Sequence, residues 1–248
     1  MKIIGIIPAR YASSRFPGKP LADIFGKSMI RRVYEQASKS SKLSRVVVAT
    51  DDQRIFDHVA GFGGEVVMTS SHHQSGTSRC QEVVKKISQQ SPDVVINIQG
   101  DEPFIDPRQI DLLADLFSDK NIEIATLIKK IQTSDELFNP NVVKAVKGKE
   151  GRAVYFSRSP IPFLRGADQT EWLQKGTFYK HIGIYAYRAE ILNEIVKLSA
   201  SPLEIAESLE QLRWIENGLA IYTSETDFEG FAVDTPEDLA KIINTISV

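Results

Sequence analysis

Short runs of β-branched and other apolar residues alternate along the chain with longer segments in which apolar residues recur every three or four positions. The short runs are typical of buried strands, and the longer segments are typical of helices that cover a sheet. Strands are predicted over Ile3–Pro8, Arg45–Thr50, Glu65–Met68, Val94–Gln99, Ile124–Lys129, Val143–Lys147, Ile182–Tyr187 and Leu219–Thr223. Helices are predicted over Met29–Ser40, Gln53–Ala60, Ser78–Gln90, Pro107–Phe117, Ala189–Leu198, Pro202–Asn217 and Pro236–Ile246. The alternation predicts an α/β fold, a three-layer α/β/α sandwich around a mostly parallel, mixed sheet.

The pattern blurs between about Gly148 and Lys180, where aromatic residues such as Phe156 and Trp172 stand among polar ones without a clean period. We interpret this stretch as an inserted arm or subdomain of a single domain that spans residues 1–248. Its apolar residues can either cover a cleft or pack against a second subunit, and the sequence leaves both open.

The charge balance argues against nucleic acid as a partner. The 248 residues include 30 basic and 32 acidic side chains, a net charge of -2, whereas nucleic-acid binding normally relies on a basic excess. No apolar run approaches the length of a membrane span, and the first one ends at Pro8, too early for a signal peptide. Cys80, the single cysteine, cannot form an intrachain disulfide and is interpreted as a small buried hydrophobe. These features predict a cytoplasmic protein without membrane insertion.

Ligands of an open parallel sheet bind beyond the carboxyl ends of its strands, so the residues that follow each predicted strand are the first candidates for a site. The segment after the first strand, Pro8–Pro20, contains Arg10, Arg15 and Lys19 among small and hydroxylic residues. This concentration of positive charge favours a polyphosphate site, although a solvated basic loop has the same composition. The glycine patterns of Walker-type ATPases and of nicotinamide dehydrogenases are both missing from the sequence.

Two aspartates follow apolar runs that are far apart in the sequence. Gly100 allows a tight turn that would bring Asp101 into the cleft, and Asp234 comes after the run at Phe231–Val233. Together they would form a hard oxygen site suited to Mg²⁺ or Mn²⁺. Asp101 alone can equally be a turn or helix-capping residue, whereas Thr235 already caps the last predicted helix and leaves Asp234 free. The neighbouring Glu102 is a weaker candidate, because its side chain can simply point at solvent.

The segment His72–Arg79 lies before a predicted helix and presents hydroxyl and backbone groups. Ser75, Gly76 and Thr77 expose backbone and hydroxyl groups that could recognise the polar edge of a base, and Arg79 adds a fork-shaped donor. The adjacent histidines have no cysteine or clear carboxylate set beside them, which argues against a metal site there.

These segments resemble the cytidylyltransferases that activate 3-deoxy-D-manno-octulosonic acid (Kdo), the CMP-Kdo synthetases. The resemblance rests on sequence blocks that occur in the order of that family and span nearly the whole chain: IPARYASSRFPGKPL (7–21), VATD (48–51), HHQSGTSR (72–79), NIQGDEPF (97–104), FNPNVVK (138–144), YFSRSPIP (155–162), HIGIYAYR (181–188), SPLEIAESLEQLR (201–213) and VDTPEDL (233–239). Two stretches depart from the family pattern: Gly230–Val233 is bulkier, and Ala167–Thr177 matches no block.

The resemblance implies a GT-A-type nucleotidyltransferase fold, a homodimer, and the reaction of CTP with Kdo to give CMP-Kdo and pyrophosphate for lipopolysaccharide synthesis. The roles it implies, position by position, are triphosphate contacts at Arg10, Arg15 and Lys19, further nucleotide contacts at Ala9, Ser75, Arg79, Gln99 and Gly100, Mg²⁺ ligands at Asp101 and Asp234, and a sugar-acid pocket of Arg158, His181, Tyr185, Glu210 and Gln211. His181 and Tyr185 lie four residues apart in a strand-like run and are therefore expected to face the same side.

Other functions remain open on the sequence alone. The same chemistry can act on a related acid, either 8-amino-Kdo or a sialic acid. A sugar-1-phosphate nucleotidyltransferase that uses UTP or dTTP would begin with a glycine-rich loop, which this chain lacks. A non-catalytic nucleotide-binding protein would be expected to lack at least one of Lys19, Asp101 and Asp234, and this chain contains all three.

Overall fold

A computed structural model describes residues 1–12, 15–87, 91–228 and 230–245. Its main sheet has a central path in the order β11-β7-β10-β6-β1-β4-β5, with β8 paired to β10 and β9 paired to β8. The strands of this sheet are β1 (Ile3–Ala9), β4 (Arg45–Thr50), β5 (Val66–Met68), β6 (Val94–Asn97), β7 (Ile124–Lys130), β8 (Lys144–Lys147), β9 (Ala153–Ser157), β10 (Tyr179–Arg188) and β11 (Ile221–Glu225). Along the central path only β10 runs antiparallel to its neighbours β6 and β7, which makes the sheet mostly parallel and mixed, as predicted.

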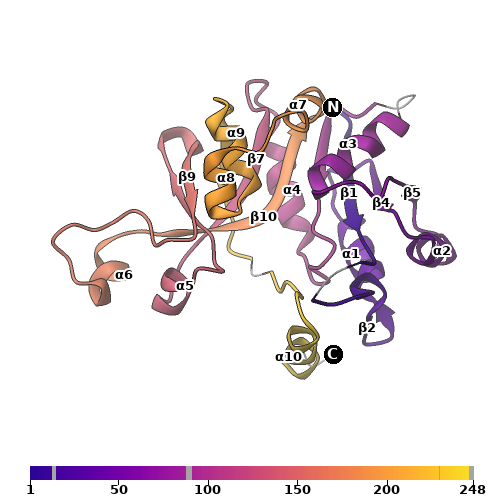
Figure 1. The fold of residues 1–248 in the computed structure, drawn as a ribbon, viewed down its shortest axis with the longest axis horizontal. Helices are drawn as coiled ribbons and strands as arrows, with labels where there is room; N and C mark the ends of the chain where they lie inside the picture. Colours follow the sequence, from indigo (N-terminus) through magenta and orange to yellow (C-terminus); the bar gives the residue numbers. More distant parts are fainter. Residues whose placement is uncertain (13–14, 88–90, 229, 246–248) are drawn as a thin grey trace.

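Helices cover both faces of this sheet (Figure 1). On one face, α1 (Met29–Ala37), α2 (Gln53–Gly61) and α4 (Pro107–Leu116) contribute to one buried apolar cluster. On the other, α3 (Gly76–Lys86), α7 (Ala189–Ile195) and α9 (Glu210–Glu216) contribute to a second. Cys80 is fully buried in this second cluster, which confirms its interpretation as a core residue. The predicted three-layer α/β/α sandwich is therefore confirmed.

The prediction of one helix over Pro202–Asn217 is wrong. The structure contains two helices, α8 (Pro202–Glu207) and α9, separated by Ser208 in a left-handed conformation with φ 53°. The guanidinium group of Arg158 donates hydrogen bonds to backbone carbonyl groups at the end of α8, where the break interrupts the helix. Its Nε donates to the backbone oxygen of Glu207 at 2.6 Å, and a terminal nitrogen donates to that of Ser208 at 3.4 Å. The break thus depends on a partner about fifty residues away, which local periodicity cannot reveal.

The stretch interpreted as an arm contains a strand that was not predicted. β9 pairs antiparallel with β8 and extends the sheet. The chain then leaves the sheet, passes through the short helix α6 (Trp172–Lys175), and returns as β10 (Figure 1). Trp172 and Phe178 pack there with Ile131 and with Leu137 of α5 (Ser134–Phe138) in a small separate cluster.

The end of the described chain packs against a segment near its beginning. A two-stranded hairpin, β2 (Asp23–Ile24) and β3 (Lys27–Ser28), follows the 3₁₀ turn at Lys19–Leu21. Ile24 of this hairpin shares an apolar cluster with Val233 and with Ile242 of α10 (Pro236–Thr245). The loop that contains Asp234 is therefore attached beside the loop that contains Lys19. Ile246 and Ser88–Gln90, the ends of two predicted helices, lie outside the described residues.

None of the helices in the described part of the chain combines the length and the apolar character that crossing a bilayer requires.

Candidate active site

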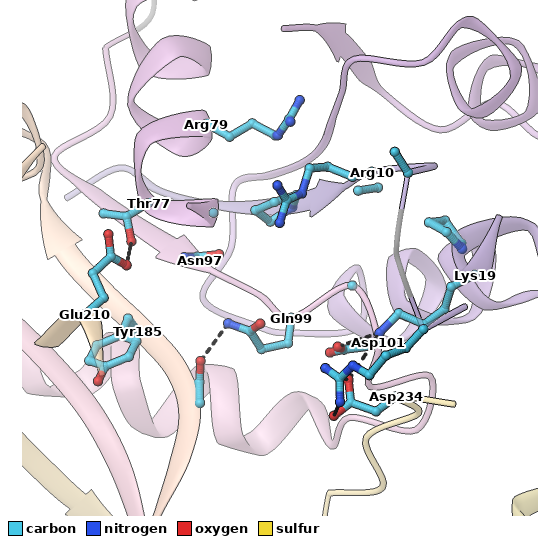
Figure 2. Close-up of a pocket in the computed structure, with 18 of the residues that line it drawn as sticks. Arg10, Lys19, Thr77, Arg79, Asn97, Gln99, Asp101, Tyr185, Glu210 and Asp234 are labelled. Carbon is cyan, nitrogen blue, oxygen red and sulfur yellow. Dashed lines mark hydrogen bonds and ion pairs between the residues drawn. The ribbon is translucent and has the colours of Figure 1, made fainter. Parts of the chain in front are cut away.

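A cavity of about 570 Å³ opens beyond the carboxyl ends of β1 and β6 and faces the beginning of α3 (Figure 2). This is the location expected for a ligand site of an open α/β sheet. Twelve of the fifteen predicted site residues line it: Ala9, Arg10, Arg15, Lys19, Arg79, Gln99, Gly100, Asp101, Tyr185, Glu210, Gln211 and Asp234. The other three, Ser75, Arg158 and His181, are not among its lining residues.

Four charged side chains converge at one end of the cavity. The Lys19 ammonium lies 2.9 Å from an Asp101 carboxylate oxygen and 3.6 Å from one of Asp234. It also donates to the backbone oxygen of Val233 at 2.9 Å. Arg15 contacts both carboxylate oxygens of Asp234 at 3.3 Å. Two acids from distant segments are thus held together by two cations of the basic loop.

The third cation of the loop, Arg10, is exposed, and Figure 2 shows its guanidinium group in the cavity. No carboxylate among the described residues pairs with it in the salt bridges of the structure. The cavity therefore carries an uncompensated positive charge beside the balanced group of Lys19, Arg15 and the two aspartates. This charge distribution suits a ligand that is itself strongly negative.

Gly100 brings the ends of β1 and β6 together. A Cβ atom at this position would lie 2.7 Å from the backbone oxygen of Pro8, closer than any real side chain tolerates. The absence of a side chain lets the turn after β6 pass directly over the end of β1. Asp101, the next residue, is therefore delivered to the basic loop that follows β1.

Glu102, the weaker acidic candidate beside Asp101, does not point at solvent. The side chain is buried, and its Oε2 atom has no hydrogen-bond partner among the described residues. Its carboxyl group packs against Gly230 instead, where a Cβ atom would lie 3.0 Å from Oε2. Burial, and secondarily the charge of Asp101, raise the pKa of Glu102 to about 7.

Replacing Glu102 by glutamine is expected to stabilise the protein at pH 8 and not at pH 4.5. Because its pKa is raised, the folded state holds this proton more tightly than the unfolded chain, so stability is lost as the pH rises from 4.5 through about 7. The neutral amide removes that loss, and we expect a gain in the free energy of unfolding of about 2 kcal/mol at pH 8. Urea denaturation at both pH values measures it; an equal gain at both would contradict the raised pKa.

The beginning of α3 forms another wall of the cavity. The Ser75 hydroxyl caps this helix by accepting from the Ser78 amide at 3.2 Å, and Gly76 and Thr77 then line the cavity. The Arg79 side chain is almost completely buried and is held by Asp51 at 3.0 Å and by the Thr69 hydroxyl at 2.6 Å. Ser75 therefore acts on the cavity only by capping the helix that lines it, whereas Arg79 lines the cavity itself.

The opposite end of the cavity is lined by polar groups of β6, β10 and α9. Glu210 accepts from the Thr77 hydroxyl at 2.7 Å, and the Gln99 amide donates to the backbone oxygen of Gly183 at 2.7 Å (Figure 2). Three buried polar atoms of cavity-lining residues lack a hydrogen-bond partner among the described residues: Asn97 Oδ1, Tyr185 Oη and Gln211 Nε2. Such atoms are costly unless a ligand or water satisfies them.

Asn97 lines the cavity although it was not predicted as a site residue, and Thr77, from the segment expected to recognise a base, lines it too. Asn97 belongs to β6, two residues before Gln99, and its place among valines and isoleucines is a signal that a search for polar residues inside buried strands would find. In the structure, the Thr77 hydroxyl donates to the Glu210 carboxylate, a contact between distant segments that the sequence did not indicate.

His181 and Arg158 take other positions. The His181 ring packs against the rings of Phe156 and Tyr185, with centroid distances of 5.1 and 5.2 Å. Burial lowers the pKa of His181 to about 3, so the ring is neutral in the physiological range. The guanidinium group of Arg158 donates to backbone oxygens at the end of α8 and to that of Pro140. The place of Arg158 in the sugar-acid pocket stays a prediction.

Comparison with known proteins agrees with this geometry. Residues 4–227 match the family model described as cytidylyltransferase. A 3-deoxy-manno-octulosonate cytidylyltransferase of Parabacteroides distasonis is 58% identical over 98% of this chain and 97% of its own length. One of Cytophaga hutchinsonii is 52% identical over 100% and 98%. The solved structure of CMP:2-keto-3-deoxy-manno-octonic acid synthetase complexed with CTP is 45% identical, with a TM-score of 0.91 over 98% of both chains. The chain belongs to the cytidylyltransferase family.

Proposed function

We propose that this protein transfers the CMP group of CTP to the anomeric hydroxyl of Kdo and releases pyrophosphate. The observation that carries the proposal is the lining of one cavity, which has a cluster of cations and aspartates at one end and, among the described residues, unpaired buried polar groups at the other. The first end suits a triphosphate and the second suits a polyhydroxylated acid. Relatives 52–58% identical over almost the full chain are named for this reaction.

The reaction is a single displacement at phosphorus, which depends mainly on positioning and charge neutralisation. The sugar hydroxyl attacks the α-phosphorus of CTP in line with the departing pyrophosphate. Arg10, Arg15 and Lys19 neutralise the triphosphate and the charge that develops on the leaving group. The beginning of α3 and Gln99 hold the nucleoside half, while Tyr185, Glu210 and Gln211 orient the acceptor.

Asp101 and Asp234 fit a divalent cation such as Mg²⁺, because their carboxylates converge within contact distance of the same ammonium group. Mg²⁺ prefers one or two protein carboxylates together with substrate phosphates and water. A triphosphate that takes over Arg15 and Lys19 would leave both carboxylates without their partners, so a cation at this point restores the charge balance. When bound, it would lower the pKa of a coordinated hydroxyl and offset phosphate charge.

Pyrophosphate release in the presence of CTP and Mg²⁺ tests the proposed function. The acids to compare are Kdo, 8-amino-Kdo and N-acetylneuraminate, and the best acid is then repeated with UTP and ATP. We expect release with Kdo and CTP. Preference for another acid would contradict only the choice of Kdo as the acceptor at the sugar end of the cavity. CTP binding without pyrophosphate release from any acid would contradict the enzymatic function.

We further propose that the protein works as a homodimer in the cytoplasm, where CTP is available, and supplies CMP-Kdo for lipopolysaccharide synthesis. Val154 of β9 and Ile205 of α8 are large apolar residues that are 58% and 69% exposed. Figure 1 shows both elements at the end of the molecule away from β5, which favours a covered surface there. Light scattering is expected to give twice the chain mass of 27.7 kDa.

Replacing Val154 or Ile205 by aspartate is expected to yield the monomer mass, because a charge in an apolar interface is costly. The control is Ile243→Asp, which alters an exposed isoleucine of α10 instead. A monomeric parent protein, or dimers with Val154→Asp and Ile205→Asp, would contradict this interface.

A further inference from the structure

The strand β10 contains an irregularity beside the sugar end of the cavity. His181 is opposite Ile128 of β7 and Ile182 is opposite Leu127, but the next pair is Tyr185 with Thr126. Three residue steps along β10 thus correspond to one residue step along β7, and the two extra residues form a bulge. In a regular strand, residues four apart are separated by about 13 Å. The bulge instead brings the rings of His181 and Tyr185 to a centroid distance of 5.2 Å.

The hydroxyl group of Thr126 lies inside this bulge. Thr126 is completely buried on β7, and its Oγ1 atom is 2.8 Å from the backbone oxygen of Ile184 and 3.1 Å from that of Ile182. The same atom is 2.9 Å from Nε2 of His181. The carbonyl between these two, that of Gly183, accepts from Gln99. The Thr126 hydroxyl and the Gln99 amide therefore lie against three successive carbonyl groups of the bulge.

The contacts of the hydroxyl decide the tautomer of His181. A threonine hydroxyl has one proton to donate, and a backbone carbonyl only accepts. If Nε2 of His181 carried no proton, the hydroxyl would have to donate to the ring, and both carbonyls would lose this donor. If Nε2 carries the proton, it donates to Oγ1, and the hydroxyl donates to the carbonyl of Ile184. The second arrangement satisfies more buried groups.

We infer that Thr126 is a positioning residue of the acceptor pocket, which fixes the bulge of β10 and holds His181 in the tautomer with the proton on Nε2. The Nδ1 atom of His181 is then a permanent hydrogen-bond acceptor. Burial keeps this ring neutral down to about pH 3. The inference rests on the proposed function in one respect: where His181 meets the sugar acid, it accepts from a hydroxyl of the sugar and does not pair as a cation with the carboxylate.

Nitrogen-15 NMR of the histidine rings tests the tautomer in the unliganded protein, independently of any activity. The His181 signals are assigned by their loss in His181→Gln. We expect an unprotonated Nδ1 and a protonated Nε2 in the parent protein and in Thr126→Ser, which retains the hydroxyl. A parent protein with the proton on Nδ1, or with a mixture of both forms, would overturn the inference even if the enzyme proved fully active.

Steady-state kinetics with Thr126→Val then tests the positioning role. Valine keeps the shape of threonine but loses the hydroxyl, so we expect the KM for Kdo to rise about tenfold and that for CTP by less than about threefold. Thr126→Ser should restore the KM for Kdo.

The matched control is Thr223→Val on the adjacent strand. Thr223 is also buried, pairs with Thr126 in the sheet and donates to a backbone oxygen, that of Gly151, away from the bulge. We expect both of its KM values to match those of the parent protein. Equal changes in Thr126→Val and Thr223→Val, or no rescue by serine, would mean that Thr126 only stabilises the fold.

Discussion

Replacing Asp101 or Asp234 by asparagine is expected to lower the turnover number by about a hundredfold to a thousandfold, while CTP still binds. Asparagine preserves the size of each side chain and removes only its charge. The two carboxylates meet at Lys19, so either change weakens the single position at which a divalent cation would be held. In the proposed function, the binding of CTP depends mainly on the cations of the Pro8–Pro20 loop and on the α3 wall, which these substitutions leave in place.

Pyrophosphate release at increasing Mg²⁺ concentration measures this effect, and the variants should need more Mg²⁺ to reach their maximum rate. Asp93→Asn provides a matched control, because Asp93 immediately precedes the opposite end of the strand that leads to Asp101. Its turnover is expected to be unchanged. Near-normal turnover of both Asp101→Asn and Asp234→Asn would rule out the assignment of these residues as metal ligands.

The second large effect is expected for Lys19→Met, with a fall in turnover of about a hundredfold and a rise of about tenfold in the KM for CTP. Methionine keeps an unbranched apolar side chain and removes the ammonium group. Lys19 is the only one of the loop cations that contacts both aspartates in the described structure. Without it, two carboxylates face each other uncompensated, and the leaving pyrophosphate loses a cation.

Lys27→Met is the control for this substitution. Lys27 lies on the adjacent hairpin and pairs with Glu35 on the surface, away from the cavity. Its kinetic constants should match those of the parent protein, and its free energy of unfolding should change little, because surface ion pairs contribute little to stability. Parent-like kinetics for Lys19→Met would be incompatible with the proposed role of Lys19.

The strand ends account for most of what the sequence predicted about the site. A parallel strand carries the residues after it to a known edge of the sheet, so the basic segment Pro8–Pro20 and Asp101 could be assigned to one cleft from the strand pattern alone. The blocks shared with the CMP-Kdo synthetases extended this to residues far from those strands. Twelve of the fifteen predicted residues line the same cavity.

The remainder depended on contacts between distant segments. The break at Ser208 is held by Arg158, and the burial of Glu102 depends on Gly230. Neither partner can be identified from local periodicity. His181 and Tyr185 were predicted on one side of a regular strand, and their rings do lie together, but the reason is a bulge that no spacing in the sequence indicates. Sequence patterns report local preference, whereas these features report tertiary context.

In the proposed function, the reversed strand β10 also divides the recognition of the two substrates along the gene. The walls from β1, α3 and β6 come from the first hundred or so residues, and the acceptor wall comes from the later segment that contains β10 and α9. Recombination between relatives on both sides of the segment from β10 to α9 would exchange the acceptor wall as a unit and leave the β1, α3 and β6 walls and Asp234 unchanged. Under the proposed function, such an exchange changes the acceptor acid of the enzyme while the residues proposed to bind CTP stay the same.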